Sequence, residues 1–153
     1  MRLWDWAAAA YARAGVEEAC LGLQDGYDQS VPYLLWAAWA AATGRALDAE
    51  TLEAGGETAR VWENAAVEPL RTIRRRLKKP IPDMGDEARE QLRDQVKTAE
   101  LSAERLLLED LETLTPAPDQ PLPLAPALVA AAKAWSSVTP RGQLEALASL
   151  LSE

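Results

Sequence analysis

Hydrophobic residues recur along this chain with the spacing of one helical face. Near the start, Val16, Ala19, Cys20 and Leu23 follow the i, i+3, i+4, i+7 pattern, and similar stripes appear in later segments. Alanine and leucine dominate, phenylalanine is absent, and residues favoured in strands are sparse. The pattern predicts an all-α protein.

Turn and capping residues divide the pattern into elements. We expect helices over about 3–14, 16–23, 31–43, 57–78 and 86–114. Ser30 and Asp48 are predicted N-caps, and Gly55 and Gly56 are predicted to end a short helix that begins after Asp48. Pro69 should kink the helix over 57–78 or divide it in two. The segment 86–114 keeps a helical stripe for about 40 Å, formed by Leu92, Val96, Ala99, Ala103, Leu106 or Leu107, Leu111 and Leu114.

A cluster of prolines marks the main boundary in the chain. Five of the 10 prolines lie between Thr115 and Pro126, which favours an extended, semi-rigid spacer. We therefore predict a single-domain bundle of about five or six helices over 1–114, a proline-rich spacer over 115–126, and a tail of two short helices over 127–153. The tail should dock on the bundle or on a second copy of the chain.

The segment Val31–Ala42 carries no charge and holds Tyr33, Trp36 and Trp39, which are expected to form the core. It is shorter than the roughly 20 residues that a membrane-spanning helix needs, so no membrane span is predicted. Trp4 and Trp6 flank Asp5 on a terminal helix that is apolar on most sides. They are candidate anchors for a protein interface.

Composition excludes several kinds of chemistry. The chain has no histidine, so Ser-His-Asp and Cys-His catalytic sites and the histidine-containing zinc and di-iron motifs are impossible. Cys20, the single cysteine, lies in an apolar stripe and is expected to be structural, as in a protein of a reducing compartment. The N-terminus lacks the features of a signal peptide, which favours a cytoplasmic location. No metal or cofactor is predicted.

A basic stretch is the strongest candidate for function, although the net charge is -8. Six of the 16 basic residues lie within nine positions: Arg71, Arg74, Arg75, Arg76, Lys78 and Lys79. They could bind an acidic protein partner or pair internally with Glu90, Asp94, Glu100 or Glu104. Nucleic acid is disfavoured, because such modules usually carry a broader basic face.

Two functions follow from these residues. The leading hypothesis is a non-enzymatic interaction or adaptor protein that uses the basic stretch and the apolar N-terminal helix to bind a protein partner or a second copy of itself. The alternative is a Mg²⁺-dependent helical enzyme that acts on a phosphate- or diphosphate-bearing substrate through Asp25, Asp28 and the arginines. The alternative requires these carboxylates and arginines to face a common cavity.

Several segments resemble a family of small bacterial proteins of unknown function. The segments are Leu3–Trp6, Tyr11, Gly15–Asp25, Val31–Trp39, Val67–Arg71 with Arg74 and Arg75, and Val96–Leu101. The similarity covers about Leu3 to Leu114 and is most specific in the first forty residues. It implies a bacterial, cytoplasmic, helical protein, and it identifies no activity, ligand or catalytic residue.

Overall fold

The computed structural model describes all residues from Met1 to Glu153 as helices joined by short connections. The helices are α1 (Leu3–Tyr11), α2 (Val16–Tyr27), α3 (Val31–Ala42), α4 (Ala49–Trp62), the π-helical segment η1 (Glu63–Val67), α5 (Glu68–Arg76), α6 (Asp86–Thr113), α7 (Leu124–Trp135) and α8 (Arg141–Ser152). There are no strands. The all-α prediction is confirmed.

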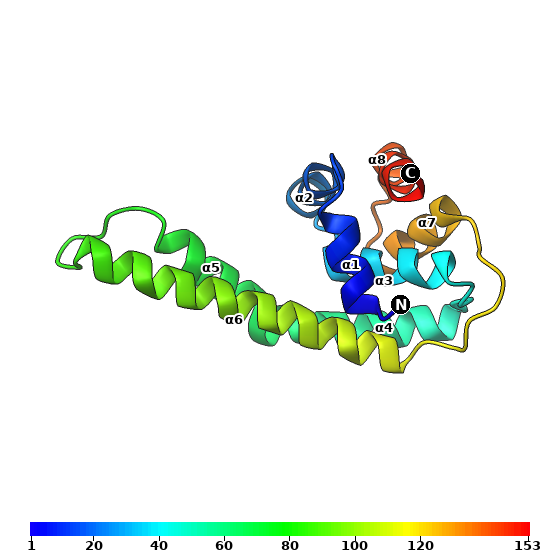
Figure 1. The fold of residues 1–153 in the computed structure, drawn as a ribbon, viewed down its shortest axis with the longest axis horizontal. Helices are drawn as coiled ribbons and strands as arrows, with labels where there is room; N and C mark the ends of the chain where they lie inside the picture. Colours follow the sequence, from blue (N-terminus) through cyan, green and yellow to red (C-terminus); the bar gives the residue numbers. More distant parts are fainter.

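Helix α3 lies at the centre of the protein body, with α1, α2, α4, α6 and α7 packed around it (Figure 1). Every residue from Val31 to Ala41 is buried. Trp36 and Trp39 are fully buried, as predicted. Their indole N–H groups donate to the Thr115 hydroxyl at 2.8 Å and to the Met1 carbonyl at 3.1 Å, which satisfies donors that burial removes from water.

Both predicted N-caps are present. The Ser30 hydroxyl accepts a hydrogen bond from the Tyr33 amide at 3.3 Å, and the Asp48 carboxylate accepts one from the Thr51 amide at 2.8 Å. These side chains satisfy amides in the first turn that have no intrahelical partner. Helix α1 ends at Tyr11, earlier than expected, and the chain turns at Gly15 in a left-handed conformation.

The prediction that Gly55 and Gly56 end a helix is wrong, because α4 continues through both residues to Trp62. Gly55 lies against the Trp36 ring, and a β-carbon at this position would come within 2.4 Å of it. The glycine therefore allows α4 to approach the aromatic core of α3 closely. Two adjacent glycines predict a helix end when only local propensity is considered. Here the packing of α4 against α3 keeps both residues helical.

The interruption predicted near Pro69 takes the form of a π-helical turn. In η1 the Glu68 amide donates to the Glu63 carbonyl, a spacing of five residues. Pro69 then occupies the first turn of α5, where a missing N–H costs no hydrogen bond. The predicted helix over 57–78 is thus divided between α4, η1 and α5.

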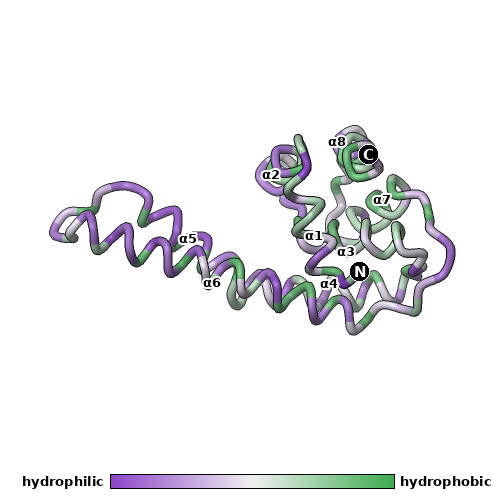
Figure 2. Tube along the Cα trace, viewed as in Figure 1, coloured by the Kyte–Doolittle hydropathy of each residue, from purple (hydrophilic) through white to green (hydrophobic).

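Helix α5 and the first half of α6 form an arm that projects from the body (Figure 1). Helix α5 packs mainly against α6 and the adjoining η1. The arm is more hydrophilic than the body in Figure 2. The predicted stripe of α6 is accordingly buried only where α6 crosses the body, at Ala103, Leu107 and Leu111. Leu92 and Ala99 are exposed because nothing covers that side of the arm, and Leu106 is exposed on the outer side of α6 beside the body.

The C-terminal tail packs within the same chain. Helix α7 lies against α3 and α4, and α8 lies against α7 and α2. Both helices bury apolar residues, namely Leu128, Ala131, Ala132 and Trp135 on α7 and Leu144, Leu147, Ala148 and Leu151 on α8. Helix α7 begins at Leu124, inside the predicted spacer, because Pro126 is tolerated in a first helical turn.

The proline-rich segment is held against the end of α3. The Asp119 amide donates to the Gly44 carbonyl at 3.0 Å, and the Leu122 amide donates to the Ala41 carbonyl at 2.8 Å. Gly44 has a φ of 74°, and a β-carbon there would lie 2.1 Å from the Asp119 carbonyl oxygen. Only glycine fits this position, both for its backbone conformation and for the close approach of the segment.

Candidate functional site

The structure divides the basic stretch into paired and unpaired residues. Arg71 and Arg74 point to α6, where both reach Glu100. Arg75 forms a longer ion pair with Asp25 of α2, at 3.7 Å, and both side chains are more than half exposed. The other three residues, Arg76, Lys78 and Lys79, are exposed and form no ion pair. Part of the stretch therefore stabilises the arm, and part of it is free.

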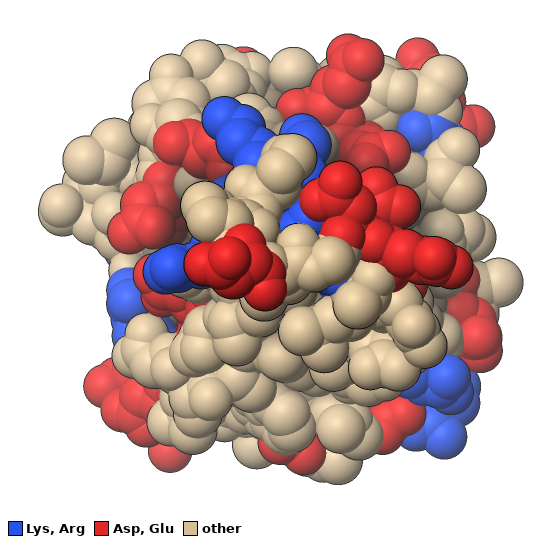
Figure 3. All heavy atoms as spheres, turned by 90° about the vertical axis from the view of Figure 1, so that its left-hand side faces the viewer, with Lys and Arg blue, Asp and Glu red and all other residues tan.

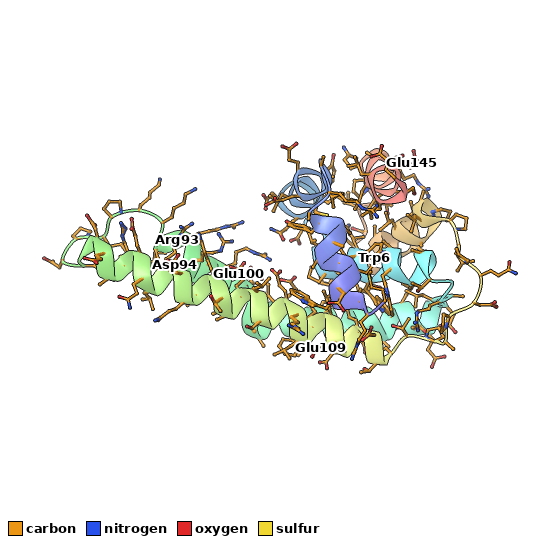
Figure 4. The ribbon with its side chains drawn as sticks, viewed as in Figure 1. Trp6, Arg93, Asp94, Glu100, Glu109 and Glu145 are labelled. Atoms are coloured by element: carbon orange, nitrogen blue, oxygen red, sulfur yellow. The ribbon has the colours of Figure 1, made fainter.

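Glu100 is the common partner of Arg71 and Arg74. Its side chain is 10% exposed, and it accepts hydrogen bonds from Nε and Nη2 of Arg74 at 2.6 and 3.3 Å. Arg71 is less well placed, with its Nε 3.6 Å from the carboxylate and no hydrogen bond to it. Figure 4 shows Glu100 on the stretch of α6 where the arm leaves the body. Of the predicted internal partners, the structure pairs Glu100 with these arginines and leaves Glu90, Asp94 and Glu104 without them.

A cleft of about 720 Å³ separates the arm from the body. One wall is mainly apolar and comes from α1, α2 and α3; the other comes from α5 and α6 and combines charged and apolar residues. The lining includes Trp4, Ala8 and Tyr11 on α1, Leu21 on α2, Leu35 on α3, Arg71 and Arg74 on α5, and Glu100, Leu101, Glu104 and Leu108 on α6. Its volume is within the range of small-molecule pockets, about 300 to 1,000 Å³.

Among the partly buried polar side chains of this cleft, those of Tyr11, Arg71 and Glu104 form no hydrogen bond to the protein. Burial, and then the neighbouring Glu100 carboxylate, raises the pKa of Glu104 to about 7. Burial also raises the pKa of Tyr11 to about 12, so its hydroxyl stays protonated at neutral pH. The cleft therefore has polar groups whose pKa values are shifted within apolar surroundings, which is typical of binding sites.

A second, polar cavity of about 340 Å³ adjoins the cleft and shares Gln24 and Arg71 with it. Its lining includes Asp25, Asp28, Arg71 and Arg75, the residues that the phosphate-chemistry alternative requires in one place. Helix α2 extends further than predicted, so Asp25 lies in its last turn and Asp28 is its C-cap. No group of three or more carboxylate or thiol side chains is arranged so that it could hold a metal ion.

The two N-terminal tryptophans are both partly buried. Trp4 lines the cleft, and the guanidinium of Arg105 lies 5.3 Å from its ring centre. Trp6 packs against the edge of the core, and Figure 4 shows it on α1 in the body. The rest of α1 covers α3 and α6, with Leu3, Ala7 and Ala10 buried. The N-terminal helix is thus less available as a contact surface than the sequence pattern indicates.

Cys20 is buried, as expected for a structural thiol. Burial raises its pKa to about 12, which suppresses the reactive thiolate.

The cleft and the roles of Tyr11 and Glu104 in it were not predicted from the sequence. One signal was present: Leu101, Glu104 and Leu108 are spaced three and four residues apart, which places a carboxylate inside an apolar helical face. The opposite wall could not be found in this way, because it comes from α1 to α3, more than sixty residues earlier in the chain.

Comparison with protein families identifies a relationship but no activity. A family model described as a protein of unknown function, DUF2390, matches residues 2–111. The chain belongs to this family. The match confirms the predicted resemblance and includes α1 to α5 and most of α6, and hence both walls of the cleft. Searches of curated proteins and of solved structures found no match. None of the helices is both long enough and apolar enough to cross a membrane.

Proposed function

We propose that the protein is a non-enzymatic interaction protein that binds an acidic partner protein through the free end of its arm. The observation that carries this proposal is the unpaired state of Arg76, Lys78 and Lys79, which lie at the end of α5 and just beyond it. Apolar side chains accompany them on the arm, since Ile73 is 46% exposed and Met84 39% exposed. Exposed apolar residues bordered by charges are typical of protein-binding surfaces.

The charge distribution favours an acidic partner. Outside Arg71–Lys79 the chain has 10 basic and 24 acidic residues, because six of its 16 basic residues lie in this stretch. Figure 3 faces the free end of the arm and shows charged side chains of both signs across the upper part of this face, with a largely uncharged area below. The acidic body of a second copy is one partner with suitable charge, so self-association is an outcome that the experiment must identify.

The test compares two charge reversals in the full chain. Changing Arg76, Lys78 and Lys79 to glutamate should preserve helicity and thermal stability, since exposed charges contribute little to folding. It should abolish capture of the partner from a bacterial lysate. The matched control reverses Lys133 and Arg141, exposed basic residues of α7 and α8, and should leave capture unchanged. Light scattering of the purified protein shows whether the partner is a second copy. If both variants capture the same proteins as the wild type, the proposal is wrong.

The phosphate-chemistry alternative has one observation in its favour, the polar cavity that Asp25, Asp28, Arg71 and Arg75 share. Arg75 is already paired with Asp25, which leaves Arg71 as the better candidate to bind a phosphate there. Calorimetric titration with pyrophosphate and Mg²⁺ tests it. Saturable binding that Asp25→Asn and Asp28→Asn both weaken would favour the enzyme; binding that is unaffected by either change, or no binding, would exclude this site.

A further inference from the structure

Arg71 is a mostly buried charged residue that faces the cleft. Its side chain is 13% exposed, yet none of its five N–H groups donates a hydrogen bond to the protein. Its only ionic contact is the 3.6 Å approach to Glu100, whose hydrogen bonds come from Arg74. Arg71 lines both the cleft and the polar cavity. A guanidinium that opens on a cleft and has free donors is a site that an acceptor can occupy favourably.

Glu104 is an unpaired, half-buried carboxyl in the cleft, where the exposed Glu17 is also unpaired. The chemistry of Arg71 and Glu104 decides which kind of ligand fits. A buried carboxyl can relieve the cost of its charge by binding a proton near neutral pH, and burial raises the pKa of Glu104 to about 7. An arginine cannot lose its proton in a protein. The cleft therefore favours a ligand with a negatively charged acceptor that can pair with Arg71. Glu104 lies beside this position and can donate a hydrogen bond to the ligand when it is protonated.

The rest of the cleft is suited to an apolar body attached to that acceptor. Trp4, Leu21, Leu35, Leu101 and Leu108 line it, and Ala8 is small, which widens the space between the aromatic side chains of Trp4 and Tyr11 on α1. An apolar ligand portion gains free energy by leaving water, about 25 cal/mol for each Å² buried. The Tyr11 hydroxyl supplies a further donor inside the cleft.

We infer that the cleft between the arm and the body is a binding site for a small amphiphilic carboxylate, whose carboxylate pairs with Arg71 and whose apolar body lies against α1, α3 and α6. This site is distinct from the free end of the arm that carries the proposed function. The two can therefore be tested separately, because Arg76, Lys78 and Lys79 do not line the cleft.

The test uses decanoate, decylammonium and decanol as probes of the full chain, each measured by titration calorimetry at pH 6. Decanoate should bind one molecule per chain and at least about tenfold more tightly than the other two, which share its apolar body. Arg71→Gln should weaken decanoate binding by about tenfold or more, and Arg71→Lys by less. Arg76→Gln is the matched control, an exposed arginine of the same helix, and should have no effect.

Two further variants separate loss of the site from loss of the fold. Ala8→Trp places a bulky ring in the cleft from an exposed position of α1, and it should abolish binding without changing the circular dichroism spectrum or the melting temperature. Glu104→Gln should keep decanoate binding strong at pH 8, where the affinity of the wild type has fallen because Glu104 is ionised. The charged groups that surround Glu104 are Glu63, Glu100, Arg71 and Arg74.

The inference is overturned by any of three results. In the first, decylammonium binds as tightly as decanoate. In the second, decanoate binds equally well to the wild type, to Arg71→Gln and to Ala8→Trp. In the third, none of the probes shows saturable binding. None of these results bears on the charge-reversal experiment at the end of the arm.

Discussion

Gly55 shows how one residue allows two helices to pack. A β-carbon at position 55 would lie within 2.4 Å of the buried Trp36 ring, which is held by its hydrogen bond to Thr115 and cannot easily move. Gly55→Ala should therefore lower the free energy of unfolding by about 1 to 3 kcal/mol, the usual effect of overpacking a core. Urea denaturation measures this change.

Gly22 provides the control for this prediction, because it also lies within a helix but nothing is within 4 Å of the position of its missing β-carbon. Gly22→Ala should raise the free energy of unfolding by about 0.5 to 1 kcal/mol through helix propensity alone. A Gly55→Ala variant that is as stable as Gly22→Ala would show that the contact between α3 and α4 is looser than described.

Glu104 should make the stability of the protein depend on pH. The native state holds the Glu104 proton up to about pH 7, while the unfolded chain releases it near the ordinary glutamate pKa of 4.5. The native state therefore binds more protons in this interval, and the contribution of Glu104 to stability is fully present below about pH 4.5 and is lost as the pH rises to 7. Glu104→Gln should remove this loss.

The measurement is urea denaturation of the wild type and of Glu104→Gln at pH 5 and pH 8. The free energy of unfolding of the variant minus that of the wild type should be about 1 to 3 kcal/mol larger at pH 8 than at pH 5. Equal pH dependence of the two proteins would show that Glu104 titrates normally and is not held in an apolar cleft.

At the scale of elements, helix α5 serves two purposes. Its residues Arg71 and Arg74, three positions apart, face α6 and hold the arm together through Glu100. The following positions place Arg76, and then Lys78 and Lys79 in the loop, at the surface. Helical geometry therefore divides the basic stretch into residues that pair with α6 and residues that remain exposed.

The tail helices supply part of the core, so their removal should have a large effect. The Trp135 ring lies 5.5 Å from that of Tyr33 on α3, and Leu128 is fully buried. A chain that ends at Thr115 should not unfold cooperatively and should bind a hydrophobic dye strongly, because α3 would be exposed along one side.

Single substitutions keep this prediction testable if the shortened chain does not fold at all. Leu128→Ala should cost about 2 to 5 kcal/mol. Leu122→Ala, at a residue that is 42% exposed, should stay within about 0.5 kcal/mol of the wild type. Equal effects of the two substitutions would indicate that α7 is not packed on α3.

At the scale of the whole molecule, the arm and the body should differ in local stability. The first half of α6 is supported mainly by α5, whereas α3 is enclosed on all sides. Amides of residues 86–99 should therefore exchange with deuterium faster than those of α3 in the native protein, because local opening of the arm exposes few apolar contacts. Mass spectrometry of exchanged peptides measures both regions in one experiment.

Equal protection of the two regions would mean that the arm is covered in solution. Repeating the exchange on a diluted sample distinguishes the causes, since a second copy of the chain would dissociate and restore fast exchange.

The residue pattern was sufficient to predict the helical class, the capping residues Ser30 and Asp48, and the core residues Trp36 and Trp39. These features depend on local geometry: helical spacing places apolar residues on one face, and a cap bonds to amides two or three positions away. The interruption near Pro69 belongs to the same group, because it follows from the missing N–H of a single residue.

The cleft, the course of α4 through Gly55 and the division of the basic stretch were decided only by the tertiary structure. Arg74 meets Glu100 across 26 positions, Gly55 meets Trp36 across two helices, and the wall that faces Glu104 comes from α1 to α3. Each depends on how far apart two helices pack and on which face each presents to the other. Periodicity along a chain shows that a helix has an apolar face, but it does not contain the distance to the helix that covers that face.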